Sequence, residues 1–281
     1  TDNIYEATFP AIECGTQVRY FVSAETTNGQ TVNDPNDAPD SSFTTISASD
    51  LRNTFADDFN TDTGWTVSGN ETDGQWERAI PIPNSQCDRG NPGSDFDGSG
   101  FAFVTDNSAA NQCNSDVDGG QTILTSPAFD TTGGDAYISY ARWFNNVEGS
   151  NPQQDPFTVQ ISGNNGTSWT TLEVVGPSGD EVFGGWYEKT FRVADFITPS
   201  SQTRIRFIAV DNDPGSVVEA AVDAFRVEVV SCEAGTELTG FTVETGSLLS
   251  GTLEDLQDSD DSFVRVRSGI GISAIEHNPS K

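Results

Sequence analysis

The chain has 281 residues, with 13 Lys and Arg against 43 Asp and Glu, which gives a formal net charge of −30. This charge excludes a general nucleic-acid-binding or anionic-membrane-binding protein, because the long-range field repels phosphate. No apolar run is long enough for a membrane-spanning helix, and the single histidine leaves little room for histidine-based catalysis or a multi-histidine zinc site. With 18 Phe and 5 Trp the chain can still bury a core.

Strand patterns recur along the chain, and helical patterns are almost absent. Apolar side chains recur at every second position in the runs 18–22, 157–161, 204–209 and 225–229, and most of the positions between them are polar or charged. Each run is bounded by Gly, Pro, Asn or Asp, which are turn residues. No 11-residue window has the apolar spacing of an amphipathic helix. The sequence therefore predicts an all-β fold, a two-sheet antiparallel β-sandwich with partial β segments at both ends.

Composition divides the chain into three segments. Residues 1–48 hold one or two strands and an Asp/Pro-rich stretch, which is too little for a complete sandwich of about 100 residues. Residues 52–231 form a β-rich block suited to one sandwich. Residues 232–281 carry two alternating runs and an acidic cluster, and they either pack on the central block or open a further domain. Because the chain starts at Thr1 without a methionine, we expect a piece of a longer polypeptide.

Several short motifs follow one another in the central block, at 58–60 with 64–65, 75–77, 100–107, 122–127 and 219–225. In this order they resemble a bacterial MAM-like (meprin/A5/mu-type) domain. The resemblance covers residues 52–231 and implies a jelly-roll, concanavalin-like sandwich. The usual cysteine framework of the animal domains is absent, and an insertion from Cys87 to Cys113 replaces it.

The first segment is similar to the end of a fibronectin type III-like domain, on the strand-like residues 5–10 and 14–24. Such domains accompany MAM-like jelly rolls in large secreted bacterial proteins, often beside peptidases or other hydrolases. The resemblance therefore implies an accessory stretch of a multidomain protein. Cysteines in an acidic chain with few lysines also favour an oxidising, extracellular or cell-surface location.

An acidic loop at residues 95–100 has the spacing of a calcium-binding loop. Asp95 and Asp97 supply carboxylates, Gly98 and Gly100 permit a tight turn, and Asp106 stands at the twelfth position. The residues after Gly100 alternate as a strand does, so a helix–loop–helix calcium hand is not expected. We expect instead a calcium site in a β-sandwich that uses Asp95, Asp97 or Asp106. The alternative is a solvated turn rich in aspartate.

A second acidic group consists of Asp211, Glu219 and Asp223. Apolar residues flank Asp223 on both sides, and a buried carboxylate is costly unless it is paired or bound to a metal. The sequence therefore predicts a structural calcium ion near Asp223. The alternative is that Asp223 pairs with Arg204 or Arg206.

The MAM-like resemblance adds two residues to this calcium site. Jelly-roll domains of this type commonly join a first-strand carboxylate to one on the last strand through calcium. Carried over to this chain, the resemblance implies that Asp58 and Asn60 meet Asp223 at one end of the sandwich.

Four cysteines are present. Cys87 and Cys113 bracket a Gly/Asn/Asp-rich loop, and a disulfide there would contribute about 3 kcal/mol in the chain-entropy model. We expect this pair. Cys14 and Cys232 flank the central block and pair either with each other or with cysteines elsewhere. A catalytic cysteine is not expected, because the only histidine, His277, lies in the terminal tail.

Aromatic side chains offer a second kind of binding site. Trp143, Trp169 and Tyr187 are candidates for stacking on sugar rings, as aromatic platforms do in carbohydrate-binding modules. Other tryptophans are expected to fill the core of the sandwich, namely Trp65, Trp76 and Trp186.

Nothing in the sequence marks an enzyme. No Gly-x-Ser-x-Gly elbow is present, and the carboxylates are too many for one catalytic pair to stand out. We therefore expect a non-catalytic, calcium-stabilised extracellular module for adhesion, spacing or assembly. The alternatives are a carbohydrate-binding accessory module of a secreted hydrolase or peptidase, and a subunit of an extracellular filament or layer completed by strand exchange. Expected partners are other domains of the same polypeptide, glycans, surface proteins or further copies of the chain. Nucleic-acid binding and membrane insertion are not expected.

Overall fold

The chain forms two compact units in the computed structural model, residues 53–229 and residues 1–52 together with 230–281. The predicted division, with 1–48 as the end of a fibronectin type III-like domain, 52–231 as the sandwich and 232–281 as a short β segment that packs on it or opens a further domain, stays a prediction. The structure describes residues 12–14, 16–25, 31–34, 38–39, 42–48, 50–82, 90–107, 116–212, 214–232, 237–238, 241–245 and 264–268.

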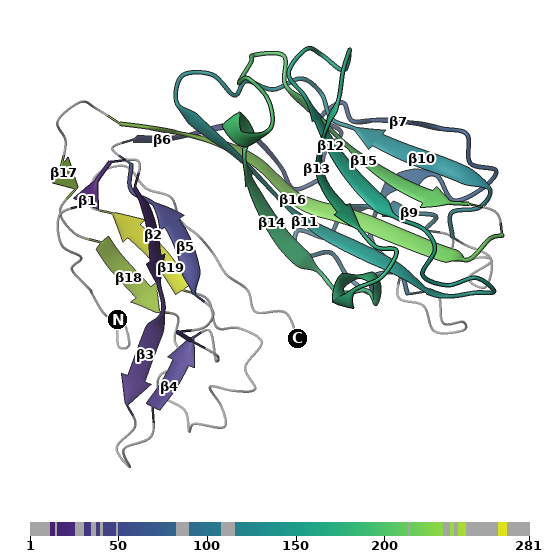
Figure 1. Ribbon diagram of the computed structural model, residues 1–281, viewed down its shortest axis with the longest axis horizontal. Helices are drawn as coiled ribbons and strands as arrows, with labels where there is room; N and C mark the ends of the chain where they lie inside the picture. Colours follow the sequence, from purple (N-terminus) through teal and green to yellow (C-terminus); the bar gives the residue numbers. More distant parts are fainter. Residues whose placement is uncertain are drawn as a thin grey trace. The chain divides into compact units, whose positions relative to one another are not determined.

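The smaller unit contains four two-stranded sheets in its described residues, and each pair is antiparallel (Figure 1). A disulfide between Cys14 and Cys232 joins its two parts of the sequence. The pairs are β1 (Ile12–Glu13) with β17 (Glu237–Leu238), β2 (Gln17–Tyr20) with β5 (Phe43–Ile46), β3 (Val22–Glu25) with β4 (Thr31–Asp34), and β18 (Phe241–Thr245) with β19 (Val264–Ser268).

The larger unit is a sandwich of two sheets, as Figure 1 shows, and this confirms the predicted all-β, antiparallel fold class. The five-stranded sheet has the order β13 (Thr170–Val175), β12 (Phe157–Ser162), β15 (Arg204–Asp211), β10 (Gly120–Thr125) and β7 (Thr66–Gly69). The six-stranded sheet has the order β14 (Tyr187–Arg192), β11 (Asp135–Glu148), β16 (Val217–Ser231), β9 (Ala102–Thr105) and β8 (Trp76–Ala79), with β6 (Asp50–Asp57) paired to β16. Short 3-10 helices occur at Asp180–Val182 and Val193–Asp195. In the described residues no helix has the length and apolar character needed to span a membrane.

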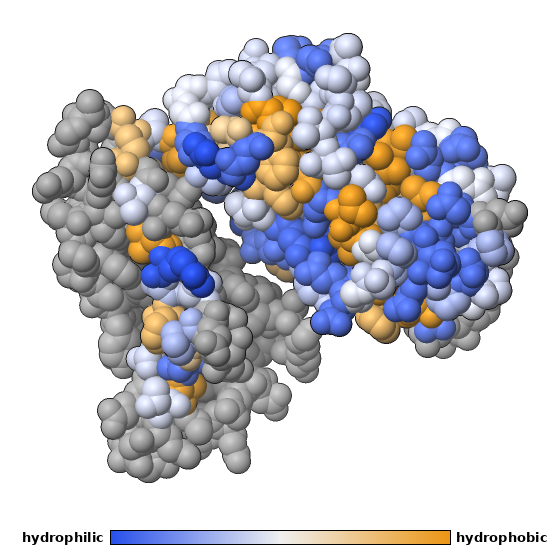
Figure 2. All heavy atoms as spheres, in the orientation of Figure 1, coloured by the Kyte–Doolittle hydropathy of each residue, from blue (hydrophilic) through white to orange (hydrophobic). Residues whose placement is uncertain are grey.

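Aromatic residues dominate the core between the two sheets. The ring of Trp65 lies 5.4 Å from that of Phe59, 6.1 Å from that of Phe207 and 5.3 Å from that of Phe225, measured between centroids. Trp76 is also buried in this core, so the prediction for Trp65 and Trp76 is confirmed. Figure 2 shows the surface of the same unit with hydrophilic side chains between separate hydrophobic patches.

The core alternation shifts once within β16. Val218, Ala220 and Val222 face the core, and the next core residue is Phe225 rather than residue 224. Ala224 has a φ of 49°, in the left-handed region that residues with a Cβ rarely adopt. One extra residue and a local change of direction are the properties of a β-bulge, which re-aims the neighbouring side chain. The bulge falls at Asp223.

A buried charged group bridges the two sheets at one edge of the sandwich. Arg142 of β11 is 1% exposed, and its Nε lies 3.0 Å from Oε1 of Glu173 in β13. The hydroxyl of Tyr140 donates to the same Oε1 at 2.7 Å, and Arg142 also forms a salt bridge with Glu181. Because burying an arginine is costly without such partners, these contacts offset the cost of placing the Arg142 charge inside the sandwich.

Candidate metal centre on the six-stranded sheet

The segment 90–100 packs against the outer face of the six-stranded sheet. Two tryptophans of that face hold its backbone. Nε1 of Trp143 donates to the carbonyl oxygen of Gly90 at 2.6 Å, and Nε1 of Trp186 donates to that of Ser94 at 3.2 Å. The Trp186 ring also contacts the ring of Phe96, with centroids 6.0 Å apart. Trp186 therefore anchors this segment and lies outside the main core, contrary to the sequence prediction.

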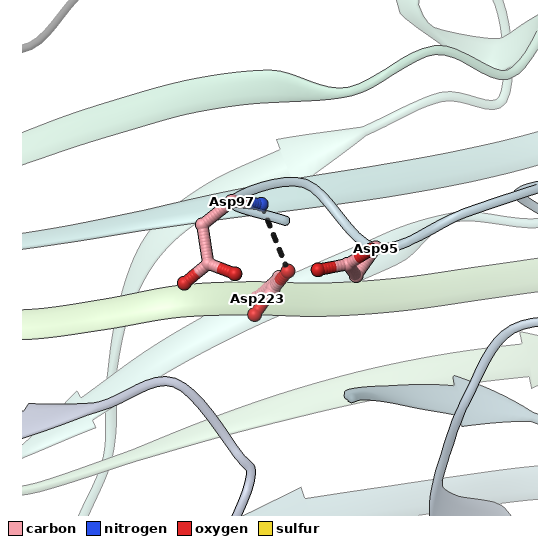
Figure 3. A group of neighbouring side chains, drawn as sticks. All are labelled: Asp95, Asp97 and Asp223. Atoms are coloured by element: carbon pink, nitrogen blue, oxygen red, sulfur yellow. Dashed lines mark hydrogen bonds between the residues drawn. The ribbon is translucent and has the colours of Figure 1, made fainter. Parts of the chain in front are cut away.

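Asp223 rises from β16 beneath this segment, and its carboxylate is fully buried (Figure 3). Oδ2 accepts hydrogen bonds from the backbone N–H of Phe96 at 2.7 Å and of Asp97 at 3.4 Å. Oδ1 accepts one from the backbone N–H of Ala224 at 2.7 Å. Asp223 thus binds backbone groups, and neither Arg204 nor Arg206 forms a described salt bridge with it.

The carboxylates of Asp95 and Asp97 lie beside that of Asp223, so that one oxygen from each is within 4.8 Å of the others. Figure 3 shows the two loop carboxylates on either side of Asp223. Local turns fix them, since Asp95 accepts from the backbone N–H of Gly100 and Asp97 from that of Ser99, both at 2.8 Å. Within the described residues, this is the place where three acidic side chains come close enough to share one ion.

Burial, together with the nearby negative charge of Asp97, raises the pKa of Asp223 to about 7. The hydrogen bonds from the backbone of Phe96, Ala224 and Asp97 oppose this rise. The group of three carboxylates therefore carries more negative charge than its protein surroundings compensate, which is the condition that a bound cation would relieve.

The donor atoms fit a hard divalent cation. All three are carboxylate oxygens, the ligands that Ca²⁺ and Mg²⁺ prefer, and among the residues that the structure describes no nitrogen or sulfur donor joins them. Two oxygens on opposite sides of a calcium ion are about 4.8 Å apart, since each Ca–O distance is about 2.4 Å. Asp95, Asp97 and Asp223 could together hold the ion, with backbone carbonyls and water completing its usual six to eight ligands.

Asp58 and Asn60, which the MAM-like resemblance adds, lie at the neighbouring loop. The Asp58 carboxylate accepts from the backbone N–H and from Nδ2 of Asn60, both at 3.0 Å, and these bonds lower its pKa. The carbonyl oxygen of Asp58 accepts from Oγ of Ser99 at 3.0 Å. The Asp58 loop therefore adjoins the metal-site loop through its backbone, and its carboxylate is outside the group of three.

The buried carboxylate of this first loop is Asp57, which the sequence analysis missed. It accepts from Nε1 of Trp65 at 2.8 Å, from the backbone N–H of Phe59 at 2.9 Å and from the hydroxyl of Thr63. Asp57 thus closes the turn after β6. The hydrogen-bonding need of a buried tryptophan eight residues away was the signal that could have found it.

The structure places Glu219 and Asp211 apart from Asp223. Glu219 is four residues before Asp223 in β16, about 13 Å along the strand, and its Oε2 accepts from the hydroxyl of Thr105 at 3.0 Å. Asp211 accepts from the backbone N–H of Ser216 at 2.9 Å and of Gly119 at 3.1 Å, so it joins two loops.

Asp106 follows β9, at the opposite end of that strand from Asp95 and Asp97. It lines a cavity of about 240 Å³ together with Glu71, Asp73 and Glu77. Burial raises the pKa of Glu77, and the charge of Asp106 adds to this effect.

The predicted sugar-stacking residues occupy three different environments. Trp143 lies under the segment 90–100, and its ring is 5.9 Å from that of Trp186. Tyr187 lies 5.5 Å from the Arg142 guanidinium. Trp169 lies on the five-stranded sheet, 4.3 Å from the guanidinium of Arg206. Of these rings, Trp169 is the one not engaged with the segment 90–100 or the buried arginine.

The disulfide between Cys14 and Cys232, which the sequence analysis left open, is present. The predicted pair Cys87 and Cys113 lies outside the described residues.

No family model matches this chain, and no curated protein matches it. Several solved structures are similar in fold. The K3 adhesin domain of Lys-gingipain from Porphyromonas gingivalis is 15% identical with a TM-score of 0.39, and the match covers 63% of this chain and 98% of that one. The carbohydrate-binding module TmCBM61, solved with β-1,4-galactotriose, is 13% identical with a TM-score of 0.38, covering 63% and 97%. A family 11 carbohydrate-binding module from Clostridium thermocellum is 11% identical with a TM-score of 0.35, covering 64% and 96%.

Proposed function

We propose that this chain is a non-catalytic, calcium-stabilised module of a larger secreted or cell-surface protein, where it serves adhesion, spacing or assembly. The observation that carries the proposal is the convergence of Asp95 and Asp97 on the buried carboxylate of Asp223. Without a cation, three carboxylates in this arrangement repel one another. With calcium, they join the segment 90–100 to β16.

The role of calcium in this proposal is to hold a loop. Residues 90–100 contain no helix or strand, and they contact the sheet through Trp143, Trp186 and the backbone bonds to Asp223. An ion bound by two loop carboxylates and one sheet carboxylate adds a strong contact at the centre of this segment. Binding energy of this kind is stabilisation of the folded state.

Two further points support the extracellular location in this proposal. The Cys14–Cys232 disulfide is of the kind that persists in oxidising compartments outside the cell. Free calcium is also abundant enough there to occupy extracellular sites of modest affinity, with dissociation constants of about 0.1–1 mM.

Calorimetric titration of the full chain with Ca²⁺, together with thermal melts in EDTA and in calcium, tests the proposal. Calcium should raise the tryptophan-monitored melting temperature, and Asp97→Asn should reduce the affinity about tenfold or more. The matched control is Asp180→Asn, which removes one exposed carboxylate from the 3-10 helix at Asp180–Val182. Identical melting temperatures in EDTA and in calcium would overturn the calcium role. Equal losses of calcium affinity in D97N and D180N would overturn it as well.

Carbohydrate binding is a second candidate function, and the pair of Trp169 and Arg206 favours it. Trp169, directly before β13, and Arg206 of β15 lie with ring and guanidinium 4.3 Å apart, and such groups recognise sugars by stacking and by hydrogen bonds to hydroxyls. Binding of the full chain to a panel of immobilised glycans tests this function independently of calcium. Binding to none of them would exclude it.

A further inference from the structure

The outer face of the five-stranded sheet differs in charge from the chain as a whole. In β15, Ile205 and Phe207 enter the core, so Arg204 and Arg206 point to the outer face. The other outward positions of these five strands, all of which are described, carry Thr, Ser, Gln, Ile or Val. None carries Asp or Glu, although the chain has 43 of them. This face is therefore locally positive on a strongly negative protein.

Neutral groups hold the guanidinium of Arg206. Its Nε and Nη2 donate to Oε1 of Gln160 at 2.8 and 2.5 Å, and its guanidinium lies 4.3 Å from the centroid of the Trp169 ring. Nε2 of Gln160 in turn donates to Oγ1 of Thr171 at 3.4 Å. A guanidinium has five N–H donors in a planar fork. The Gln160 bonds use two, so the Nη1 amino group and one N–H of Nη2 remain for a ligand.

Arg204 shares this pattern. Its Nε donates to Oδ1 of Asn165 and its Nη1 to the carbonyl oxygen of Ser126, both at 2.6 Å. In the described residues, Arg142, Arg192 and Arg226 instead form salt bridges with carboxylates. Burial lowers the pKa of Arg206, consistent with a charge that has no counter-ion beside it. An arginine held in this way is preorganised for an incoming carboxylate.

The neighbours of Arg206 across the strands are hydroxyl and amide side chains. Thr125, Arg206, Gln160 and Thr171 pair in register across four adjacent strands, and such a row is about 14 Å long. A flat row of hydroxyl and amide groups suits a ligand with many hydroxyls. A peptide would need a strand edge or an apolar groove instead.

We propose that this face binds a glycan whose sugars carry carboxylates, with a sugar carboxylate paired to the Arg206 guanidinium and sugar hydroxyls bound along the row from Thr125 to Thr171. The inference rests on the second function proposed above, and it names the class of ligand. The net charge of −30 does not prevent such binding at physiological salt, because the Debye length there is only about 8 Å.

The test measures binding of the full chain to oligogalacturonate, to its methyl ester and to neutral oligogalactose by calorimetry in 0.15 M salt. Methyl esterification removes the charge and leaves the sugar ring. We expect the free acid to bind at least about tenfold more tightly than the ester. Arg206→Met should remove this preference and leave the affinities for ester and acid equal. Arg192→Met is the matched control, since it removes an exposed arginine from β14, and it should leave the preference intact.

Each outcome bears on a distinct claim. Equal affinity of the unsubstituted chain for acid and ester would overturn the carboxylate assignment and leave carbohydrate binding in place. An equal loss of the preference for the acid in R206M and R192M would do the same. Binding to no glycan would overturn both. Self-association that R206M abolishes in mass photometry would overturn the glycan assignment in favour of an acidic protein ligand. Unchanged tryptophan-monitored melts establish that R206M folds, and Gln160→Leu, which removes the support of the guanidinium, should reduce the same preference.

Discussion

The carboxylate of Asp223 accepts a hydrogen bond of 2.7 Å from the backbone N–H of Phe96, although 127 residues separate the two in the sequence. This bond joins a segment without regular structure to the β-bulge of β16. Val222 faces the core, so the regular alternation of β16 points Asp223 to the outer face, and the loop turns place Asp95 and Asp97 around it. The proposed metal site therefore requires both the sandwich and the loop to be folded.

Substitution of Asp223 should have opposite effects in the two metal states. In EDTA at pH 8, Asp223→Asn should raise the melting temperature, because the amide does not carry the buried negative charge. In calcium, the unsubstituted chain should be the more stable, because the variant lacks a metal ligand. Tryptophan fluorescence measures the melting temperature in EDTA and in calcium. The control variant D180N should have the melting temperature of the unsubstituted chain in each of these conditions. A lower melting temperature of D223N in EDTA would contradict the assigned charge at Asp223.

The same carboxylate should make the metal-free stability depend on pH. The pKa of Asp223 is about 7 in the folded chain against its ordinary value of 3.8, so between these pH values the folded state holds a proton that the unfolded state has released. The free energy of unfolding should therefore fall with rising pH between about 4 and 7, by about 1.4 kcal/mol per unit from this group, and level off above 7. The unfolding free energy of D223N in EDTA, subtracted from that of the unsubstituted chain at each pH, isolates the contribution of Asp223. A difference that does not change with pH would exclude this contribution.

Calcium affinity should follow the same ionisation. Since Ca²⁺ binds the ionised carboxylate, the apparent affinity should rise about tenfold per pH unit up to about pH 7 and then become constant. Calorimetric titrations between pH 5 and 8 measure this slope. A constant affinity over that range would show that Asp223 is not a ligand.

The sequence was sufficient for the fold class, because β12 and the second half of β16 alternate regularly between apolar and polar residues and the turn residues are strong. It assigned Asp95 and Asp97 to one calcium site and Asp223 to another, and the structure brings these three carboxylates into a single group. It could not separate Asp57 from Asp58, because adjacent residues differ only in which face they reach. The sequence shows the shift of alternation between Val222 and Phe225, which are three positions apart, and this spacing would have predicted the bulge.

Replacement of Arg142 by alanine should lower the free energy of unfolding far more than replacement of Arg192 by alanine. Arg142 is 1% exposed and pairs with Glu173 and Glu181, so its loss leaves carboxylates without their counter-charge and should cost about 3–5 kcal/mol of unfolding free energy. Arg192 has a side chain 47% exposed in its salt bridge with Asp135, and its loss should leave stability almost unchanged because solvent screens the pair. Urea unfolding of the two variants compares them. A small effect at Arg142 would show that the edge closes without it.

Removal of the Cys14–Cys232 disulfide should affect the smaller unit selectively. All five tryptophans lie in residues 53–229, so their fluorescence reports the larger unit alone. The double variant C14S/C232S should leave the tryptophan-monitored melt unchanged and raise amide exchange in β2 and β5 about tenfold or more. A parallel fall of the tryptophan-monitored melting temperature would show that the two units unfold together.

The same disulfide has a mechanical consequence. Cys14 and Cys232 are 218 positions apart, and the whole of residues 53–229 lies between them. When the chain is stretched from its two ends, tension passes across the sulfur–sulfur bond and bypasses the sandwich. Both the loop held by Asp223 and the arginine-bearing face would then keep their shape under a pulling force that extends the neighbouring parts of the polypeptide.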